Sequence, residues 1–239
     1  MPPLTFGRTI RGISEFIEVA IHTILYVRQV YPQDLFVRRK KYDTPVFQSR
    51  HPALNDYISG AVKAIADELI QGNVDKVVVV IKDKDHVPLE RFIFSVENMI
   101  AVESFNKDTA IEDAMSSEAL GKYFRAFLVK LNMIESQLSI LNTTSSDVSF
   151  AIILELKGNA VPTARDGQDP PPWIPANVQD TTTGTQDDAE LLMVRAVNTG
   201  VVNVSLNPAL LCPFFNFFSK ALLSRTRVSR KTPARERTP

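Results

Sequence analysis

A long apolar segment near the N-terminus constrains the fold more than any other feature of this chain. Placed on a helix at about 100° per residue, its polar side chains fall within a stripe of about 60°. That stripe consists of Arg11, Glu15, Glu18, His22 and Gln29. A helix with so narrow a polar stripe is packed on several sides, so we expect it at the centre of a domain. We expect it to end at Tyr31-Pro32, because proline pushes the preceding residue out of the helical region.

Two further segments predict a helix and a hairpin. Pro52 is favoured at a first helical position, and Gly72 is placed to end that helix. Its apolar residues recur at helical spacing and predict one buried face: Leu54, Ile58, Ala61, Val62, Ile65 and Leu69. The apolar, β-branched run 77–81 predicts a central strand covered on both faces. A polar turn and the alternating segment 92–96 complete a hairpin.

The chain then predicts a third helix and another strand. Thr109 and Glu112 have the spacing of a capping box and begin a helical region. Its apolar residues alternate spacings of four and three, which predicts one face of a core helix: Leu120, Phe124, Phe127, Leu131, Ile134, Leu138 and Leu141. Alternation over 148–156 predicts a well-covered strand. The order of elements indicates an α+β fold with three helices packed on an antiparallel sheet.

Composition bounds the class of protein. With 239 residues, 44% of them hydrophobic, the chain is long enough for one domain with a substantial core. No apolar run approaches the length of a membrane span, and the N-terminal residues lack the pattern of a signal peptide. The single Cys212 has no partner for an internal disulfide, which predicts a reducing compartment, either cytosol or nucleus.

Charge is unevenly distributed, although the net charge is zero. Residues 207–239 carry +6, so the remainder carries −6. A net-acidic body is a poor surface for tracking phosphates, so we expect no strong direct DNA binding. The basic run Arg38–Lys41 is interpreted as a solvated edge whose charges discourage strand pairing, in preference to a binding patch.

The sequence shows no motif of catalysis or metal binding. Its three histidines, His22, His51 and His86, lie in different predicted elements without a second ligand at metal spacing. It has no phosphate loop, dinucleotide motif or nucleophile elbow. We therefore predict a protein that is not an enzyme and that holds neither a metal nor a cofactor.

The segment from Lys157 to about Leu206 differs in composition from the rest. It contains Pro162, the run Pro170–Pro172, Pro175 and the only tryptophan, Trp173. A tract of this length without regular structure in a compact domain is usually functional or disordered. The simpler reading is a surface loop with a polyproline stretch.

Several of these segments resemble the HORMA family over residues 6–200. They are the first helix with its ending ILYVRQVYP, the run RRKKY, the helix start HPALNDYI and the strand VDKVVVVI. Within the family they are most similar to the accessory subunit of translesion DNA polymerase zeta. The resemblance implies a HORMA domain over 1–206, with a core at 6–157 and a mobile "seat belt" at 158–206 that closes over a partner peptide.

The resemblance also implies roles for individual residues. Tyr57 and Trp173 match positions that hold a proline-containing peptide of the polymerase's catalytic subunit. Arg125 and Ser136 match positions of a HORMA–HORMA interface, which implies a homodimer or heterodimer. Leu191 matches a position that recruits the scaffold polymerase of translesion synthesis. The family also implies nuclear localisation, with cytoplasm as a second compartment, and release of the bound peptide by a remodelling ATPase.

The family pattern stops at about Gly200. A phenylalanine cluster and then a basic run follow, and we predict that 207–239 is a disordered tail. Our hypothesis is that a mis-annotated or alternatively spliced transcript replaces the family's C-terminus here. The family's last strand completes a sheet edge, so its loss predicts an unpaired edge. The basic run alternatively serves as a nuclear-localisation signal or a nucleic-acid arm.

Two other functions stay open on the sequence. A spindle-checkpoint HORMA protein shares the ILYxRxxYP pattern, although HPALNDYI, RRKKY and the DKDH turn favour the polymerase subunit. A direct DNA-binding protein depends on the basic tail alone. A strong salt dependence of DNA affinity would support it.

Overall fold

Helix α1, Phe6–Val27, lies at the centre of the molecule. The computed structural model describes residues 5–98, 115–134, 148–158, 160–163, 173–184, 190–191, 195–198 and 202–210. Ile13, Phe16 and Ile17 on α1 are fully buried, and the helix contacts other helices and a strand on different sides. The prediction of a central helix that is packed on several sides is therefore confirmed.

The end of α1 differs from the prediction. The helix ends at Val27, with Arg28 as its C-cap, rather than at Tyr31. Gln29 adopts a left-handed backbone with φ of 52°, which turns the chain before Pro32 is reached. His22, placed on the polar stripe by the sequence, is buried, and its Nδ1 accepts the N–H of Ser49 at 3.5 Å.

Helices α2 and α3 flank α1. Helix α2, Pro52–Gln71, begins after the His51 cap and ends at Gly72, whose φ of 79° is left-handed, as the sequence predicts. Helix α3, Ser117–Met133, begins at the Ser116 cap. The predicted capping box at 109–112 and the predicted helical residues 138 and 141 lie outside the described residues. Short 3₁₀ turns, η1 at Gln33–Leu35 and η4 at Val178–Asp180, complete the helical elements of the described ranges.

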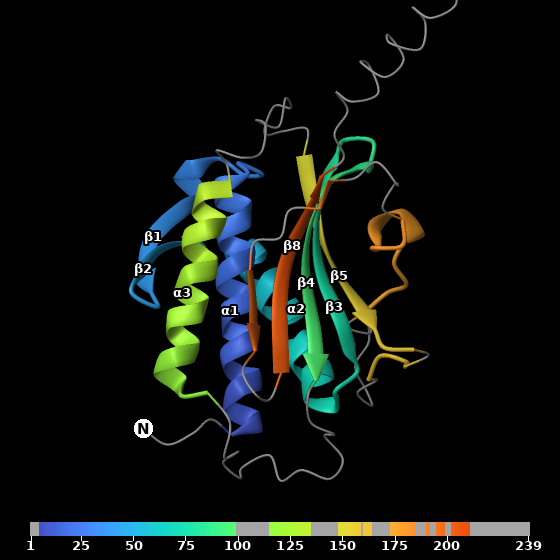
Figure 1. Cartoon of the computed structure of the whole chain (residues 1–239). Coiled ribbons are helices and arrows are strands. Elements are labelled where there is room, and N and C mark those ends of the chain that lie inside the picture. The colour runs from blue at the N-terminus through green and yellow to red at the C-terminus, as the bar shows by residue number, and fades with distance from the viewer. Residues whose placement is uncertain are drawn as a thin grey trace, which may run out of the picture.

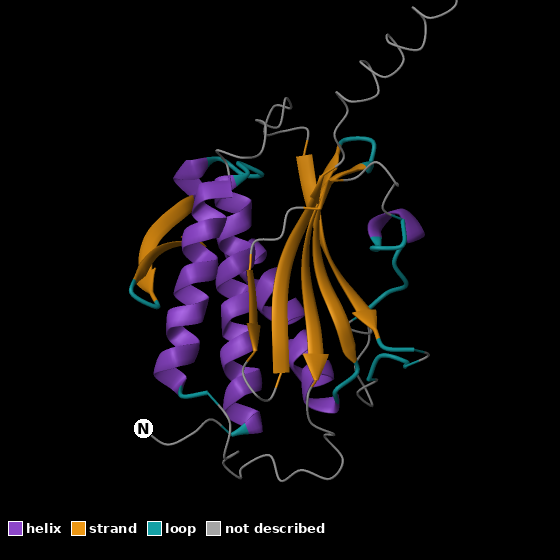
Figure 2. Ribbon diagram, in the orientation of Figure 1, coloured by secondary structure: helices purple, strands orange, loops and turns teal. Residues whose placement is uncertain are grey.

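The main sheet is antiparallel, with described strands in the order β5-β3-β4-β8-β6, and β7 also pairs with β8. The bounds are β3 Val74–Asp83, β4 Pro88–Asn98, β5 Val148–Leu156, β6 Glu190–Leu191, β7 Arg195–Asn198 and β8 Val202–Leu210. Helices cover one face of this sheet, and a small hairpin packs on the far side of the helices (Figures 1 and 2). The α+β architecture is the one predicted.

The small hairpin, β1 Phe36–Lys41 with β2 Thr44–Ser49, corrects one prediction. The basic run belongs to β1, and Arg38, Arg39 and Lys40 are exposed as expected, yet the strand pairs with β2 along its whole length. Its two-residue turn places Tyr42 and Asp43 at φ of 49° and 54°. Both are left-handed, as a type I′ hairpin turn requires.

Strand β8 corrects another prediction. It pairs with β4 over nine residues, from Glu90–Leu210 to Asn98–Val202. The expectation that this sheet edge would stay unpaired is therefore wrong. Residues 207–210, assigned by the sequence to a disordered tail, end a strand, and residues 211–239 lie outside the described part of the chain.

Two apolar clusters cover the two faces of the sheet. The large core lies between the sheet and the helices, where Phe16 of α1 stacks on Phe124 of α3 at 4.4 Å between ring centroids and meets Phe94 of β4 edge-on at 6.3 Å. The small cluster, on the opposite face, consists of Val78, Val80, Ile93 and Ile153. Strand β3 is thus buried on both faces, as its continuous apolar run predicts.

Candidate peptide-binding edge

Strand β5 is a free edge of the main sheet among the described strands. It pairs with β3 along its length, and it stands at the end of the strand order. Only Ile152 and Ile153 on it are buried, so the prediction of a well-covered strand is only partly correct. A free edge presents N–H and C=O groups that can pair with an added strand.

A segment of the chain wraps around this edge. We call the described residues 160–163 and 173–184 the strap. On the helix-facing side, the backbone N–H of Thr163 donates to the carboxylate of Glu68 on α2 at 2.5 Å, and Trp173 packs against the large core. On the opposite face, Asp180 pairs with Lys82 of β3 at 2.6 Å. The strap therefore crosses from one face of the sheet to the other beside β5 (Figure 1).

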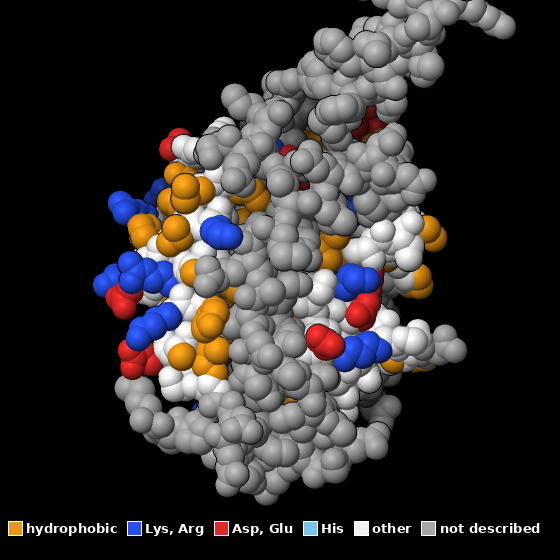
Figure 3. Space-filling model, viewed as in Figure 1, with side chains coloured by type: hydrophobic (Ala, Val, Ile, Leu, Met, Phe, Trp, Pro, Cys, Tyr) orange, Lys and Arg blue, Asp and Glu red, His pale blue; other side chains and the backbone are white. Residues whose placement is uncertain are grey.

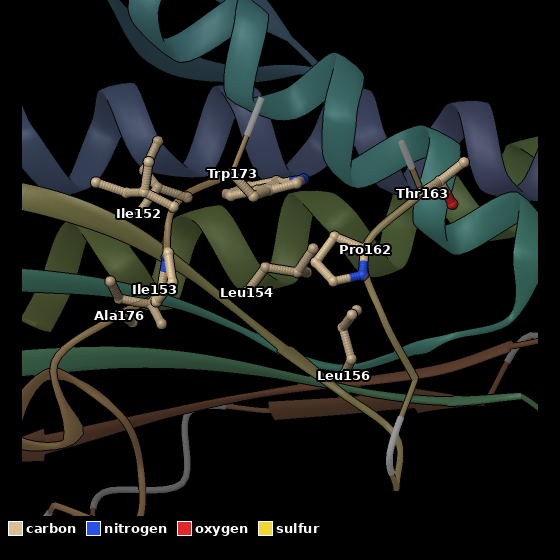
Figure 4. A pocket seen from close by; sticks show the side chains of 10 residues that line it. Ile152, Ile153, Leu154, Leu156, Pro162, Thr163, Trp173 and Ala176 are labelled. Atoms are coloured by element: carbon tan, nitrogen blue, oxygen red, sulfur yellow. The ribbon is translucent and has the colours of Figure 1, made fainter. Parts of the chain in front are cut away.

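An apolar cavity of about 450 Å³ lies between the strap and β5. Its lining combines residues from both faces of the strand with strap residues: Ile152, Ile153, Leu154, Leu156, Pro162, Thr163, Trp173, Ile174, Pro175 and Ala176. Because side chains alternate between the faces of a strand, a cavity lined by both Ile152 and Ile153 follows the strand edge. Figure 4 shows the Trp173 ring beside Ile152 and Pro162 beside Leu154.

Aromatic rings flank the start of β5 on its helix-facing side. Phe150 meets Tyr57 of α2 edge-on at 5.6 Å and Tyr31 at 6.1 Å between centroids. Burial raises the pKa of Tyr31, and neighbouring Tyr57 raises it further, so the Tyr31 ring stays uncharged at neutral pH. Phe150, which contacts Tyr57, and Ile152, which lies beside Trp173, are successive helix-facing residues of β5. Tyr57 and Trp173 therefore flank the same strand.

The structure thus brings together two of the site residues predicted from sequence and leaves the others apart. Tyr57 is 48% exposed, so it is not a core side chain, and Trp173 lines the cavity. Arg125 is exposed on α3, and that helix lies away from β5 (Figure 1). Leu191 lies in β6, where it pairs with Ala209 of β8. Ser136 lies outside the described residues.

Sequence reasoning missed Tyr31 and Phe150 as members of this site. Tyr31 entered only as a helix stop, and Phe150 only as an alternating strand residue. They are far apart in sequence and meet through packing, so no local spacing connects them.

The geometry fits the binding of an extended peptide. The described residues hold no group of three or more metal-ligating side chains. No helix among the described residues has the length and hydropathy to span a bilayer. A free strand edge, an apolar cavity and flanking aromatic rings are the features that bind an extended peptide.

Comparisons with known proteins identify the family of this chain. The HORMA domain profile matches residues 10–148. The Mitotic spindle assembly checkpoint protein MAD2B of Rattus norvegicus is 32% identical over 206 residues, covering 85% of this chain and 92% of the relative. The DNA polymerase zeta processivity subunit of Schizosaccharomyces pombe is 38% identical over 129 residues, covering 54% of this chain and 61% of that protein.

Solved structures share the fold. C. elegans HTP-2 bound to HTP-3 closure motif 1 superposes with a TM-score of 0.62 at 14% identity, covering 85% of this chain and 86% of that chain. At this identity the likeness concerns the fold alone. With the profile match and the MAD2B relative, it leads to one conclusion: this chain belongs to the HORMA domain family.

Proposed function

We propose that this protein is the non-catalytic accessory subunit of DNA polymerase zeta. It clamps a proline-containing peptide of the catalytic subunit along β5, under the strap. The observation that carries the proposal is the strap itself, which encloses an apolar cavity at a free strand edge. The relative from Schizosaccharomyces pombe, named as a processivity subunit of this polymerase, supports the choice of partner.

The chemistry of the cavity supports an extended, proline-containing ligand. An added strand gains main-chain hydrogen bonds from the β5 edge, while its alternate side chains enter the cavity. A proline ring presents an apolar face that packs on aromatic rings, and its fixed backbone loses little entropy on binding. Trp173 supplies such a ring in the wall of the cavity, and Tyr57 supplies another against Phe150 at the start of β5.

Other surfaces serve the bridging role of such a subunit. Arg125 lies on an exposed face of α3 beside the apolar Val129 and Met133, which are 41% and 61% exposed. Figure 3 shows hydrophobic side chains over α3, with Lys and Arg gathered over the β1–β2 hairpin. This face is the proposed HORMA–HORMA interface, and the β6–β8 region around Leu191 is the proposed contact for the scaffold polymerase. The protein acts in the nucleus, and a remodelling ATPase opens the clamp.

Peptide binding tests the proposal directly. Overlapping peptides that tile the catalytic subunit of polymerase zeta from the same species are titrated into the full chain by calorimetry. A proline-containing peptide is expected to bind, and its proline-to-alanine variant to bind more weakly. If the full chain binds no segment of the catalytic subunit, the proposal is wrong.

Two parallel titrations separate this function from its rivals. Peptides from checkpoint proteins test the spindle-checkpoint function suggested by the name of the rat relative. A DNA titration at several salt concentrations tests direct nucleic-acid binding, which would show a steep salt dependence. The proposal requires the catalytic-subunit peptide to bind more tightly than either.

A further inference from the structure

Polar side chains fix the strap to the face of the sheet that is remote from the helices. Lys82 of β3 pairs with Asp180 at 2.6 Å, with side-chain exposures of 12% and 4%. The guanidinium of Arg91 on β4 donates to the backbone carbonyls of Gln179 and Gly184. Two inner strands of the sheet therefore hold one short piece of the strap.

The third strand adds a further point of attachment. The backbone N–H and the hydroxyl of Thr182 both donate to the carboxylate of Glu155 on β5, at 2.5 and 2.7 Å. Lys76 of β3 contacts the same carboxylate at 3.3 Å. We call Lys82, Arg91 and Glu155, with the strap residues 179–184, the buckle.

The buckle has one tight backbone geometry. A Cβ atom on Gly184 would lie 2.2 Å from the carbonyl oxygen of Val178 and 2.7 Å from the Cα of Gln179. Backbone atoms cannot yield as a flexible side chain can, so only glycine closes this loop. The polar residues 181–184 therefore have a defined backbone path in the structure.

The buckle lies apart from the peptide cavity. Lys82, Arg91 and Glu155 are absent from the cavity lining. They share the face of the small cluster, because each lies two residues from one of its members, Val80, Ile93 or Ile153. A substitution in the buckle therefore acts on the strap without removing a contact to a peptide.

The polar network of the buckle is incompletely satisfied. Within the part of the chain that the structure describes, Nε and Nη1 of Arg91 and Oδ1 of Asp180 are buried without a hydrogen-bond partner, and Arg91 is only 2% exposed. A partly satisfied buried network is less stable than a complete one. Such a network suits a fastener that holds the strap and still has to open.

We propose that the buried pair of Lys82 and Asp180 fastens the strap and thereby sets how long a peptide stays bound, with Lys82 acting as a positioning residue. The inference rests on the proposed function, because it needs a peptide under the strap. A peptide enclosed between β5 and the strap leaves when the strap detaches. The buckle therefore controls the dissociation rate, while the cavity and the β5 edge control which peptide is held.

The test uses the full chain with substitutions that break the Lys82–Asp180 pair. Lys82→Met removes the charge but keeps the length of the side chain, and Asp180→Asn removes the charge but keeps the shape of the side chain. Lys82→Arg keeps the positive charge and should therefore keep the strap fastened. Gly184→Ala opens the loop without changing charge, with exposed Gly60→Ala as its control. The control for the ion pair is Glu118→Gln with Lys122→Met, which removes an exposed pair of α3.

Two readouts are compared. Hydrogen exchange of the peptide-free chain reports on the amides of 177–184, and stopped-flow fluorescence reports the release of a labelled proline-containing peptide of the catalytic subunit. We expect Lys82→Met, Asp180→Asn and Gly184→Ala to speed exchange in the strap alone. We also expect them to raise the dissociation rate by about tenfold or more, with a much smaller change in the association rate.

The outcomes separate this inference from the proposed function. Unchanged exchange in all three variants, or faster exchange with an unchanged dissociation rate, overturns the role of the buckle. A wild-type chain that binds no catalytic-subunit peptide contradicts the proposed function and the control of residence time with it. The exchange data then still decide whether Lys82 and Asp180 fasten the strap. Exchange and dissociation rates in Lys82→Arg that match those of the wild type would show that the positive charge of Lys82 fastens the strap.

Discussion

The ring of Tyr57 on α2 lies edge-on to the ring of Phe150 on β5, with planes at 76° and centroids 5.6 Å apart. Nearly half of Tyr57 stays exposed, so this contact leaves one side of the ring free beside the strand edge. A ring held by one neighbour and open on the other side is suited to anchor a ligand.

Replacing Tyr57 should therefore weaken peptide binding more than folding. We expect Tyr57→Ala, and likewise Trp173→Ala, to lose roughly 2–4 kcal/mol of binding free energy, as truncated aromatic anchors do. Calorimetry measures the loss, and Tyr57→Phe should retain most of the affinity. Val87→Ala, which trims an apolar side chain that is 49% exposed in the β3–β4 turn, is the control. Unchanged affinity in both aromatic variants would contradict the site.

Self-association should depend on α3. We expect Arg125→Ala to shift a dimer toward monomer in light scattering, because the exposed guanidinium supplies several donors that a partner surface can pair with. Peptide affinity should stay unchanged, since α3 is remote from β5. Lys63→Ala, exposed on α2, is the matched control. A variant that still dimerises would place the interface elsewhere.

His22 should make the fold sensitive to mild acid. Burial lowers the pKa of His22 from 6.5 to about 4, so the folded chain keeps it neutral while the unfolded chain takes up a proton near pH 6.5. Stability is therefore retained above pH 6.5 and lost as the pH falls toward 4, by up to about 3 kcal/mol. Urea unfolding at several pH values measures this slope. His22→Asn should flatten it, whereas His86→Asn in the exposed turn should not.

The stability of the fold should fall when one partner of the ion pair between Arg28 and Glu90 is removed. Two hydrogen bonds of 2.8 and 2.5 Å join these buried groups. Arg28→Met should cost about 3–5 kcal/mol of stability, because it leaves a buried charge unpaired. Arg28→Met with Glu90→Leu should recover much of that loss in urea unfolding.

The pH dependence of that variant has a definite sign. Burial raises the pKa of Glu90, although Arg28 opposes the shift, and removal of Arg28 should raise that pKa further. A raised carboxyl pKa gives stability at low pH that is lost as the pH rises through it. The deficit of Arg28→Met should therefore be smaller at pH 5 than at pH 8. An equal deficit at both would exclude a buried charge as the cause.

Local sequence patterns predicted those elements whose position or ends depend on nearby residues alone. The apolar run of β3 requires cover on both faces, and Pro52 and Gly72 set the ends of α2 through their own backbone preferences. The β1–β2 hairpin was missed because its turn is Tyr42-Asp43. Two side chains other than glycine adopt positive φ there, and Asn-Gly or Asp-Gly would have signalled the turn. Strand β8 was missed because its partner β4 lies more than 100 residues earlier in the chain.

Only those site residues could be predicted that match a family pattern one by one. Tyr57 and Trp173 came from their match to a family pattern. The buckle came from the structure alone, since Lys82 and Asp180 are 98 positions apart and neither stands out in its own segment. Contacts of this kind depend on how the strap crosses the sheet, and no periodicity in the chain encodes that path.

The strap around β5 has a mechanical consequence. Hydrogen bonds in an antiparallel pair run perpendicular to the strands. A pull along the axis of a strand seated on β5 would load all of those bonds together, in shear, instead of opening them one after another from an end. The strap would also block displacement away from the edge. A peptide held antiparallel to β5 in this way would resist a pull along its own axis with many contacts at once, so the connection is stronger than any single contact.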